Sequence, residues 1–513
     1  MIATRFELVG LIHRMTPKKV LIFVVSYHAA NFIQSVLERI PEEVWENDLY
    51  EVEVLVIDDE SPDDTFYRAI DYQRAYLHKA ITVLHNPKNQ GYGGNQKLGY
   101  YYAIKHAFDA VVLLHGDGQY PPEHIHQMVM PLLNDEADAV FGSRMINKTD
   151  ALKGGMPLYK WIGNQILTRA QNRILGTNLS EFHSGYRAYR VKALEAIPFG
   201  YNSNYFDFDT DIIIQLLDTG RRIVEIPIPT FYGDEVSRVN GLRYAMLIIS
   251  TSLRSRLVPF GIFYDPRFDY VAEGMQYTPK LDFPSSHQFA LDHTKPESTV
   301  LDLGCGPGFM TEALSTRGMK VISVDLHIHP QAEHYSVKTI EANLETYDFS
   351  DEFEKIDTIL ILDIIEHLRN PEDLLFKVRE RFIQDAPTII ITTANIGFFL
   401  VRMGLLFGQF NYGKRGILDM DHTRLFTFYS LRRALSNEGY EILEEKGIPA
   451  PFPLISSKRI GQVLVFINQL LIRWWPGMFA YQMAFVVKPK PTLDYLLQTA
   501  HHSSQQKLES YSK

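Results

Sequence analysis

The stretch Val52–Asp59 reads VEVLVIDD, a mostly apolar run that ends in two aspartates. Similar apolar runs lie at Val20–Val25 (VLIFVV) and at Ala110–Leu114, which His115-Gly116-Asp117 follows. Apolar runs rich in β-branched residues, separated by helical patterns, indicate parallel strands that are buried on both faces of a sheet. Because ligands bind at the carboxyl ends of such strands, the acids after these runs predict a binding site.

A second series of the same kind begins at Thr299–Leu303. It continues with Lys320–Val324 before Asp325, Thr358–Leu362 before Asp363, and Thr388–Thr392. The two series predict an α/β protein with two domains, separated by a proline-containing stretch from Pro259 to Pro296. We expect a first domain at residues 1–257, a linker at 258–280, a second domain at 281–490 and a polar tail at 491–513.

The composition excludes several classes of protein. The 513 residues carry a net charge of −10, whereas dedicated nucleic-acid binders are usually basic. The one cysteine, Cys305, excludes an intramolecular disulfide and fits a reducing compartment. No apolar run approaches the roughly 20 residues that a membrane-spanning helix needs. We therefore expect a cytoplasmic protein without a nucleic-acid partner, either soluble or peripheral to the inner face of the cell membrane.

Three clusters in the first half combine into a predicted nucleotide-sugar site. Asp58 and Asp59 end a strand, where a carboxylate can bind ribose or base. The loop Asn86–Gly99 (NPKNQGYGGNQKLG) brings glycines to the start of a helix, which tolerates the close approach of a phosphate. In His115–Glu123 (HGDGQYPPE), Asp117 lies in a glycine-flanked turn that suits a divalent cation bridging a diphosphate. Hard oxygen ligands favour Mg²⁺ or Mn²⁺ there.

From Lys18 to Arg256 the chain resembles the family 2 glycosyltransferases of GT-A fold, in particular the dolichol-phosphate-mannose-synthase-like group. The resemblance rests on the three clusters and on GSR (Gly142–Arg144), SGYRAYR (Ser184–Arg190) and IVEIPIPT (Ile223–Thr230). It implies two sets of residues: a nucleotide-sugar site of Asp58, Asp59, Gly91, Asp117 and Arg144, with Arg144 on phosphate, and a metal site of His115, Asp117 and Gln119.

Three residues depart from the family's pattern. His115 stands at the first acid of the Asp-x-Asp motif, and an imidazole suits Mn²⁺ better than Mg²⁺. Glu60 stands where the family usually has glycine in its Asp-Asp-Gly-Ser turn, and Asn164 falls near a usual serine. These departures put the identity of the metal, and the dependence on a metal, in question.

The expected reaction is an in-line displacement at the anomeric carbon with inversion, in which the metal at Asp117 and Arg144 stabilise the departing diphosphate. A polyprenyl phosphate acceptor is already ionised and needs no base. A hydroxyl acceptor needs one, and the candidate is Asp211, ahead of Asp209, in FDFDTD (Phe206–Asp211). The alternative interpretation is that these two aspartates only cap the helix that follows.

In the second half, VLDLGCGPG (Val300–Gly308) places glycines at Gly304, Gly306 and Gly308. A dinucleotide-binding loop would need its third glycine at position 309, which is Phe309. Asp302 within the strand end is also foreign to that fingerprint. Asp325 ends the next strand, where an acid can bind both hydroxyls of a ribose. This pattern favours a nucleoside ligand without a pyrophosphate.

From Tyr277 to Lys488 the chain resembles the class I S-adenosylmethionine-dependent methyltransferases, with a Rossmann-like fold, and is similar to the ubiquinone-biosynthesis O-methyltransferases. The matching segments include NLE (Asn343–Glu345) and DIIEHLRNPE (Asp363–Glu372). The resemblance implies S-adenosylmethionine as cofactor, bound by Asp302, Gly304, Gly306, Gly308, Asp325, Asn343, Glu345 and Asp363.

Methyl transfer is one displacement at the sulfonium methyl group, helped by alignment and exclusion of water. An oxygen acceptor also has to lose its proton, and His367 is the first candidate for the base, with His422 second. The alternative is that His367 only packs against the cofactor pocket. Cys305 is expected to be a small apolar filler and not a nucleophile.

Two apolar stretches, Ile396–Phe410 and Arg459–Trp475, follow the last strands of this half. Such stretches can cover a lipid-like acceptor or rest on a membrane. We favour core helices under a lid, because each has few lysines for a polar face.

The sequence therefore predicts a bifunctional transferase. Its first half would move a sugar from a nucleotide-sugar donor to a polyprenyl phosphate or glycan, and its second half would methylate an oxygen of a glycan or lipid-linked product. One alternative is a methyltransferase whose glycosyltransferase-like half is inactive and only binds substrate. Another is a lipid- or quinone-modifying methyltransferase joined to an unrelated transferase.

Overall fold

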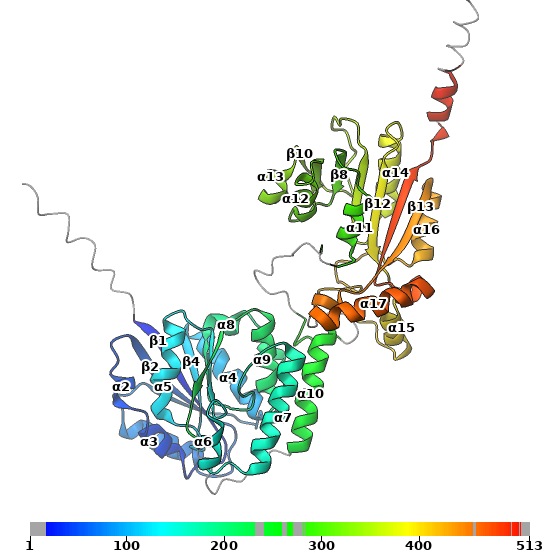
Figure 1. Ribbon diagram of the computed structural model, residues 1–513. Helices are drawn as coiled ribbons and strands as arrows, with labels where there is room; N and C mark the ends of the chain where they lie inside the picture. Colours follow the sequence, from blue (N-terminus) through cyan, green and yellow to red (C-terminus); the bar gives the residue numbers. More distant parts are fainter. Residues whose placement is uncertain are drawn as a thin grey trace, which may run out of the picture. The chain divides into compact units, whose positions relative to one another are not determined.

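The computed structural model describes residues 17–230, 241–258, 264–269, 281, 283–454, 458–493, 495–501 and 503. They form two compact units, which divide near Arg256, and the segment that starts at Asp265 returns to the first unit. Figure 1 shows a sheet flanked by helices in each unit. The prediction of an α/β protein with two domains is confirmed.

The first sheet has the strand order β3-β2-β1-β4-β6-β5-β7. Only β6 runs antiparallel to its neighbours, β4 and β5. The strands are β1 (Lys18–Ser26), β2 (Tyr50–Asp58), β3 (Ile81–His85), β4 (Ala110–His115), β5 (Ala139–Ser143), β6 (Arg187–Arg190) and β7 (Ile223–Pro227). The chain leaves β1 for β2 on one side and reaches β4 on the other, so the order reverses between β1 and β4. Ligands bind at such a reversal, next to the ends of β2 and β4.

Alternate residues of the central strands enter two separate cores. Val20, Ile22 and Val24 pack with α1 (Ile33–Glu38), α3 (Thr65–Ala75) and α5 (Ile125–Leu133). Leu21 and Phe23 pack with α4 (Tyr92–Lys105), α8 (Val191–Glu195) and α9 (Phe208–Asp218) on the other face. Burial on both faces explains why these strands are continuously apolar. Helices α7 (Leu158–Leu175) and α10 (Gly241–Leu257) complete the main helices of the unit.

The second sheet has the order β10-β9-β8-β11-β12-β14-β13, with β14 antiparallel to β12 and to β13. The strands are β8 (Thr299–Leu303), β9 (Lys320–Asp325), β10 (Lys338–Glu341), β11 (Thr358–Leu362), β12 (Thr388–Ala394), β13 (Tyr440–Ile448) and β14 (Gln482–Pro489). Helices α14 (Pro371–Phe382) and α16 (Phe428–Asn437) pack in one core, and α11 (Ser286–His293) and α12 (Phe309–Ser315) in the other. The order reverses between β8 and β11, next to the glycine-rich loop.

The apolar insertion forms α15 (Phe399–Leu406), α17 (Lys458–Trp474) and the short α18 (Pro476–Phe479). The prediction that these stretches are core helices is wrong for one face of α15 and of α17. Val401, Val465 and Ile472 are buried, whereas Leu406, Phe466 and Trp474 are exposed. Among the helices that the structure describes, none combines the length and the apolar character that crossing a membrane requires.

Candidate functional sites

The two aspartates after β2 have different partners. Asp58 is 1% exposed and its Oδ2 lies 3.0 Å from His85 Nδ1, while its Oδ1 is buried and makes no hydrogen bond within the described residues. Both carboxylate oxygens of Asp59 accept hydrogen bonds from the glycine-rich loop, among them the backbone N–H of Gly91 at 3.0 Å. Asp58 therefore keeps one carboxylate oxygen available to accept a hydrogen bond from a ligand, whereas both oxygens of Asp59 hold the glycine-rich loop in place.

Two backbone positions explain the sequence of these loops. Gly91 has φ +79°, and a Cβ there would lie 2.6 Å from the carbonyl oxygen of Asn204, so only glycine fits. Glu60 also has a left-handed backbone, with φ 58°, at the position where the related family uses glycine. Its Oε2 accepts the backbone N–H of Asn89 at 2.7 Å, which ties this strained turn to the loop.

His115, at the end of β4, and Asp117, which follows it, have different hydrogen-bond partners. Asp117 Oδ1 accepts the backbone N–H of Gln119 at 3.1 Å, which closes a tight turn. The Tyr92 hydroxyl donates to Asp209 Oδ2 at 3.1 Å and lies 3.3 Å from His115 Nε2, so this nitrogen carries the hydrogen and donates to Tyr92. Burial lowers the pKa of His115, and the ring is neutral. Nε2 of His115 is therefore not a cation ligand in this arrangement.

The described residues contain no group of three His, Cys, Asp or Glu side chains that could hold a metal ion by themselves. A nucleotide-bound Mg²⁺ commonly uses one or two carboxylates together with substrate phosphates. Asp117 supplies one carboxylate of this kind at the edge where β4 ends. The residues thus fit a cation that protein and substrate hold jointly.

The two candidate bases lie on the first turn of α9. Asp211 is fully buried, and its carboxylate accepts from Arg267 at 3.0 and 3.1 Å and from the backbone N–H of Ser203 at 2.8 Å. Burial raises the pKa of Asp211 to about 6, against the opposing effect of Arg267. Asp209 lies in the network of Tyr92 and His115, and its Oδ1 is buried without a hydrogen bond within the described residues. Asp209 Oδ2 also lies 3.9 Å from Nη2 of the buried Arg187, so each aspartate is paired with an arginine. Which of the two acts as a base stays a prediction.

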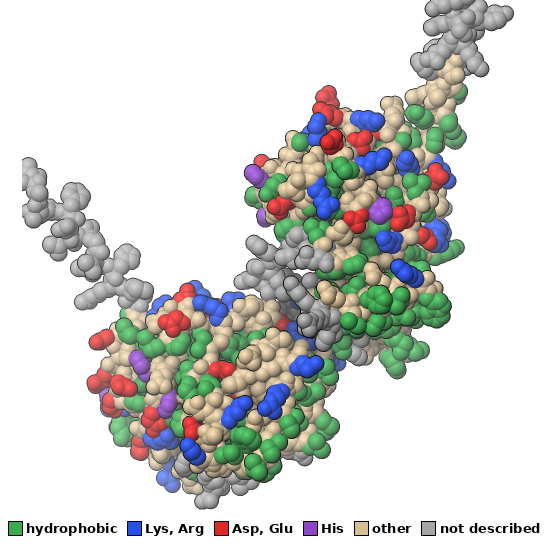
Figure 2. Space-filling model, viewed as in Figure 1, with side chains coloured by type: hydrophobic (Ala, Val, Ile, Leu, Met, Phe, Trp, Pro, Cys, Tyr) green, Lys and Arg blue, Asp and Glu red, His purple; other side chains and the backbone are tan. Residues whose placement is uncertain are grey.

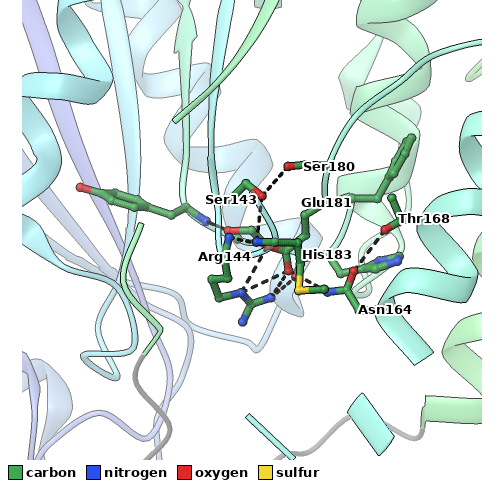
Figure 3. Close-up of polar contacts among 12 residues, drawn as sticks. Ser143, Arg144, Asn164, Thr168, Ser180, Glu181 and His183 are labelled. Carbon is green, nitrogen blue, oxygen red and sulfur yellow. Dashed lines mark hydrogen bonds and ion pairs between the residues drawn. The ribbon is translucent and has the colours of Figure 1, made fainter. Parts of the chain in front are cut away.

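Arg144 is held by a residue that the sequence did not single out. Glu181 lies between Arg144 and Asn164 in Figure 3. The Arg144 guanidinium lies 2.5 Å from Glu181 Oε1, and Asn164 Nδ2 donates to the same oxygen at 2.8 Å. Arg144 Nη2 also donates to the carbonyl oxygen of His183 at 3.1 Å. The ion pair fixes the guanidinium predicted to meet phosphate, and Asn164 connects it to α7.

Replacing Glu181 with glutamine is expected to destabilise the first unit by about 3–5 kcal/mol, because it removes the carboxylate that pairs with the buried Arg144 guanidinium. The side chains of Glu181 and Arg144 are only 0% and 13% exposed. Glu123→Gln is the matched control, since its ion pair with Arg39 lies on the surface, and it should cost at most about 1 kcal/mol. Hydrogen-exchange mass spectrometry in denaturant resolves the two units. Equal losses in the two variants would contradict the prediction.

In the second unit, the glycine-rich loop and Asp325 meet as predicted. The backbone N–H of Gly306 donates to Asp325 Oδ2 at 2.8 Å. Gly304, Gly306 and Gly308 all have positive φ. A Cβ on Gly304 would lie 2.3 Å from Ile364, and one on Gly308 would lie 2.5 Å from the backbone nitrogen of Ala332. The backbone at these two glycines thus packs too closely for any side chain.

Asp302 is 2% exposed beneath this loop and accepts a hydrogen bond from Thr311 Oγ1 at 3.3 Å. Burial is the main reason why the pKa of Asp302 rises to about 7. Burial also raises the pKa of Cys305 to about 12, which agrees with the expectation that this thiol is not a nucleophile.

The raised pKa of Asp302 makes the stability of the second unit depend on pH. An unfolded aspartate ionises near pH 4, whereas folded Asp302 keeps its proton to about pH 7, so its contribution to stability falls as the pH rises between these values. Asp302→Asn has no such proton. The unfolding free energy of Asp302→Asn minus that of wild type should therefore increase by roughly 2 kcal/mol between pH 5 and pH 8. Denaturant unfolding checks this, and exposed Asp292→Asn is the control. A pH-independent difference would contradict it.

The loop after β11 carries several predicted site residues. Asp363 has φ 54°, and its carboxylate accepts from Thr392 at 2.9 Å, Gln482 at 2.8 Å and Ser286 at 3.2 Å. Glu345 Oε1 accepts the backbone N–H of Arg369 at 2.8 Å, so the segment after β10 is attached to this loop. Asn343 Oδ1 accepts the backbone N–H of Glu345 at 3.0 Å. The contacts hold these residues along the carboxyl ends of the strands.

His367 and His422 lie together, with ring centroids 4.8 Å apart. Nδ1 of His367 lies 3.2 Å from the carbonyl oxygen of Asp421, and Nδ1 of His422 lies 2.9 Å from that of Ile417. A carbonyl only accepts, so each Nδ1 carries a hydrogen, and in the neutral form of each ring the lone pair lies on Nε2. Either Nε2 can therefore accept a proton.

Sequence reasoning missed Glu366, which lies directly before His367. It is 2% exposed, and burial next to Asp363 raises its pKa to about 8. Its Oε1 accepts the backbone N–H of Ala394 at 3.2 Å, and its backbone carbonyl accepts from Thr423 and Arg424. Glu366 thereby fixes the segment that carries His422. The motif DIIEHL (Asp363–Leu368), in which Glu366 lies between Asp363 and His367, was the feature of the sequence that could have identified it.

Comparisons with known proteins agree with the two-unit arrangement. Residues 21–197 match the model "Glycosyl transferase family 2", and residues 275–445 match the model "Methyltransferase domain". An undecaprenyl-phosphate mannosyltransferase of Micrococcus luteus is 30% identical over 258 residues, which cover 47% of this chain and 99% of that protein. A polyprenol monophosphomannose synthase of Mycolicibacterium smegmatis is 28% identical over 218 residues, which cover 40% and 78%. A solved S-adenosylmethionine-dependent methyltransferase of Archaeoglobus fulgidus is 17% identical with a TM-score of 0.28, covering 39% and 90%.

Proposed function

Because the chain belongs to the family 2 glycosyltransferases and carries a methyltransferase domain after the glycosyltransferase domain, we propose that it is a bifunctional transferase acting on lipid-linked sugars. The first unit transfers a sugar from a nucleotide-sugar donor to a polyprenyl phosphate. The second unit transfers a methyl group from S-adenosylmethionine to an oxygen of a glycan or lipid-linked product. Both family resemblances are confirmed by the matches.

The observation that most supports sugar transfer is the meeting of three features at one reversal of strand order: Asp58, the loop held by Asp59, and Asp117. Asp58 Oδ1, which makes no hydrogen bond within the described residues, suits a nucleoside, and the glycine backbone of the loop allows a phosphate to approach. A divalent cation, Mg²⁺ or Mn²⁺, held by Asp117 and the diphosphate would supply charge for the leaving group. The guanidinium of Arg144, fixed by Glu181, adds positive charge.

A polyprenyl phosphate is favoured as the acceptor because its ionised oxygen attacks the anomeric carbon without a base. The described contacts agree with this choice, since Asp211 is occupied by Arg267. If the acceptor is a glycan hydroxyl, the candidate base is Asp209, whose Oδ2 lies 3.9 Å from Arg187 and whose Oδ1 makes no hydrogen bond within the described residues. In the second unit, the glycine turn and Asp325 would hold the cofactor, and Nε2 of His367 would accept the proton of the methyl acceptor.

The test is reconstitution with the full chain. GDP-mannose, UDP-glucose and UDP-N-acetylglucosamine are each incubated with undecaprenyl phosphate in detergent and Mg²⁺ or Mn²⁺, and the lipid fraction is analysed by mass spectrometry. S-adenosylmethionine with a labelled methyl group is then added. A glycolipid that gains one methyl mass supports both activities. Methylation of a supplied glycolipid without consumption of any donor would favour an inactive first unit, which the hydrogen bond between His115 and Tyr92 makes the second candidate.

A further inference from the structure

Helix α17 has two apolar faces. On the inner face, Asn468 Oδ1 accepts the backbone N–H of Ala450 at 3.0 Å, and its Nδ2 donates to the carbonyl oxygen of Phe479 at 2.9 Å. Buried Val465 and Ile472 flank Asn468 at helical spacing. This face fixes α17 to the second unit and leaves the opposite face outside the core.

The outer face of α17 is a continuous apolar stripe. Phe466, Ile467, Leu470 and Trp474 lie three, four, seven and eleven residues after Val463, and all five are exposed, Trp474 to 76%. In an ordinary surface helix this spacing marks the buried side, with polar residues outside. Here the stripe carries no polar residue. A regular apolar stripe that faces outward indicates a surface that contacts something apolar.

Helix α15 extends the stripe. Phe479 contacts Phe399 of α15, with ring centroids 5.8 Å apart, and stacks on Trp474 of α17 at 6.3 Å. Leu406 and Phe407, at the end of α15, are more than 70% exposed. We call the outer residues Leu406, Phe407, Phe466, Ile467, Leu470 and Trp474 the α15–α17 surface. Figure 2 shows hydrophobic side chains gathered where Figure 1 places these two helices.

The charge of this region identifies the kind of partner. Residues 396–418 and 449–482 contain no aspartate or glutamate, although the chain as a whole carries a net charge of −10. The two segments contain six cations: Arg402, Lys414, Arg415, Lys458, Arg459 and Arg473. Exposed apolar side chains with tryptophan at their margin, in a segment that carries only positive charge, complement an anionic lipid surface.

We propose that the α15–α17 surface inserts into the interface of an anionic lipid bilayer and holds the methyltransferase unit on the membrane. The occupant is the lipid headgroup and upper acyl region, and the exposed Arg402 and Arg473 of the same helices supply positive charge near the headgroups. The proposal goes beyond the transfer reactions and does not depend on them, because it concerns the bilayer and not the polyprenyl acceptor.

The test is flotation of the full chain with vesicles that contain no polyprenyl phosphate. One set holds phosphatidylglycerol and phosphatidylcholine, and the other phosphatidylcholine alone. Wild type should float with the anionic set and bind less as salt is raised. Phe466→Ser combined with Trp474→Ser should reduce apparent affinity at least about tenfold, and Arg473→Glu should reduce binding to anionic vesicles selectively.

The matched control is Phe376→Ser combined with Tyr429→Ser, two exposed aromatic residues of the same unit on α14 and α16. This variant should float like wild type, and unchanged thermal unfolding of each variant shows that folding is intact. The proposal is overturned if wild type stays in solution, or if both double variants lose binding equally. It is also overturned if the α15–α17 variant changes the sedimentation coefficient and not flotation, which would identify a second copy as the occupant. None of these outcomes alters sugar transfer to an acceptor dispersed in detergent, so the proposed function is tested separately.

Discussion

Asp117→Ala is expected to lower the rate of sugar transfer by at least about 10³-fold, because no other acid in the turn after β4 can hold a cation on the leaving diphosphate. His115 cannot replace it through Nε2, which donates to Tyr92. A second measurement is calorimetric binding of the nucleoside diphosphate with and without Mn²⁺. In the variant, addition of Mn²⁺ should no longer strengthen binding.

Two further variants separate the metal role from general damage. Exposed Glu136→Gln should behave as wild type in both measurements. His115→Ala should retain most of the Mn²⁺ effect on binding, if the cation is held by Asp117 and the diphosphate. If His115→Ala and Asp117→Ala lose the Mn²⁺ effect equally, the imidazole is a ligand after all, and the arrangement proposed for the cation is wrong.

Asp325→Ala is expected to weaken the binding of S-adenosylhomocysteine at least about 100-fold, which corresponds to about 2.7 kcal/mol. The carboxylate accepts the backbone N–H groups of Gly306 at 2.8 Å and His327 at 3.2 Å. The variant therefore loses both the ribose contact and a support of the glycine turn. Calorimetry and the thermal shift produced by S-adenosylhomocysteine measure the effect without any acceptor.

The control for this variant is Asp348→Ala, an exposed aspartate of the same unit, which should bind S-adenosylhomocysteine normally. Binding of the nucleotide-sugar donor should be unaffected by either change. Loss of donor binding in Asp325→Ala would show that the two sites are not independent, and unchanged S-adenosylhomocysteine binding would remove Asp325 from the cofactor site.

Much of the fold could be predicted because buried parallel strands leave a direct trace in the sequence. The run that ends at Asp58 forms β2, and the run that ends at Asp325 forms β9. The glycines of both loops were predictable for the same reason, since close backbone approach excludes side chains at Gly91 and Gly304.

The roles of individual acids could not be predicted because they depend on partners far away in the chain. Asp211 pairs with Arg267, 56 residues later, whereas Asp209 lies 3.9 Å from Arg187, 22 residues before it. Glu181 acquires its importance from Arg144, 37 residues before it. The outer stripe of α17 was misjudged because its pattern is that of a buried helix, and only the position of Asn468 in the structure shows which face is inside.

The return of residues 265–269 to the first unit determines where the chain can be divided. Arg267 forms its ion pair with buried Asp211, and Phe268 is itself buried. A truncation after Leu257, at the boundary that the sequence suggests, would remove the Arg267 guanidinium and leave the buried Asp211 carboxylate without it. An isolated glycosyltransferase fragment should therefore extend at least beyond Phe268, which lies about halfway through the segment predicted to be a linker.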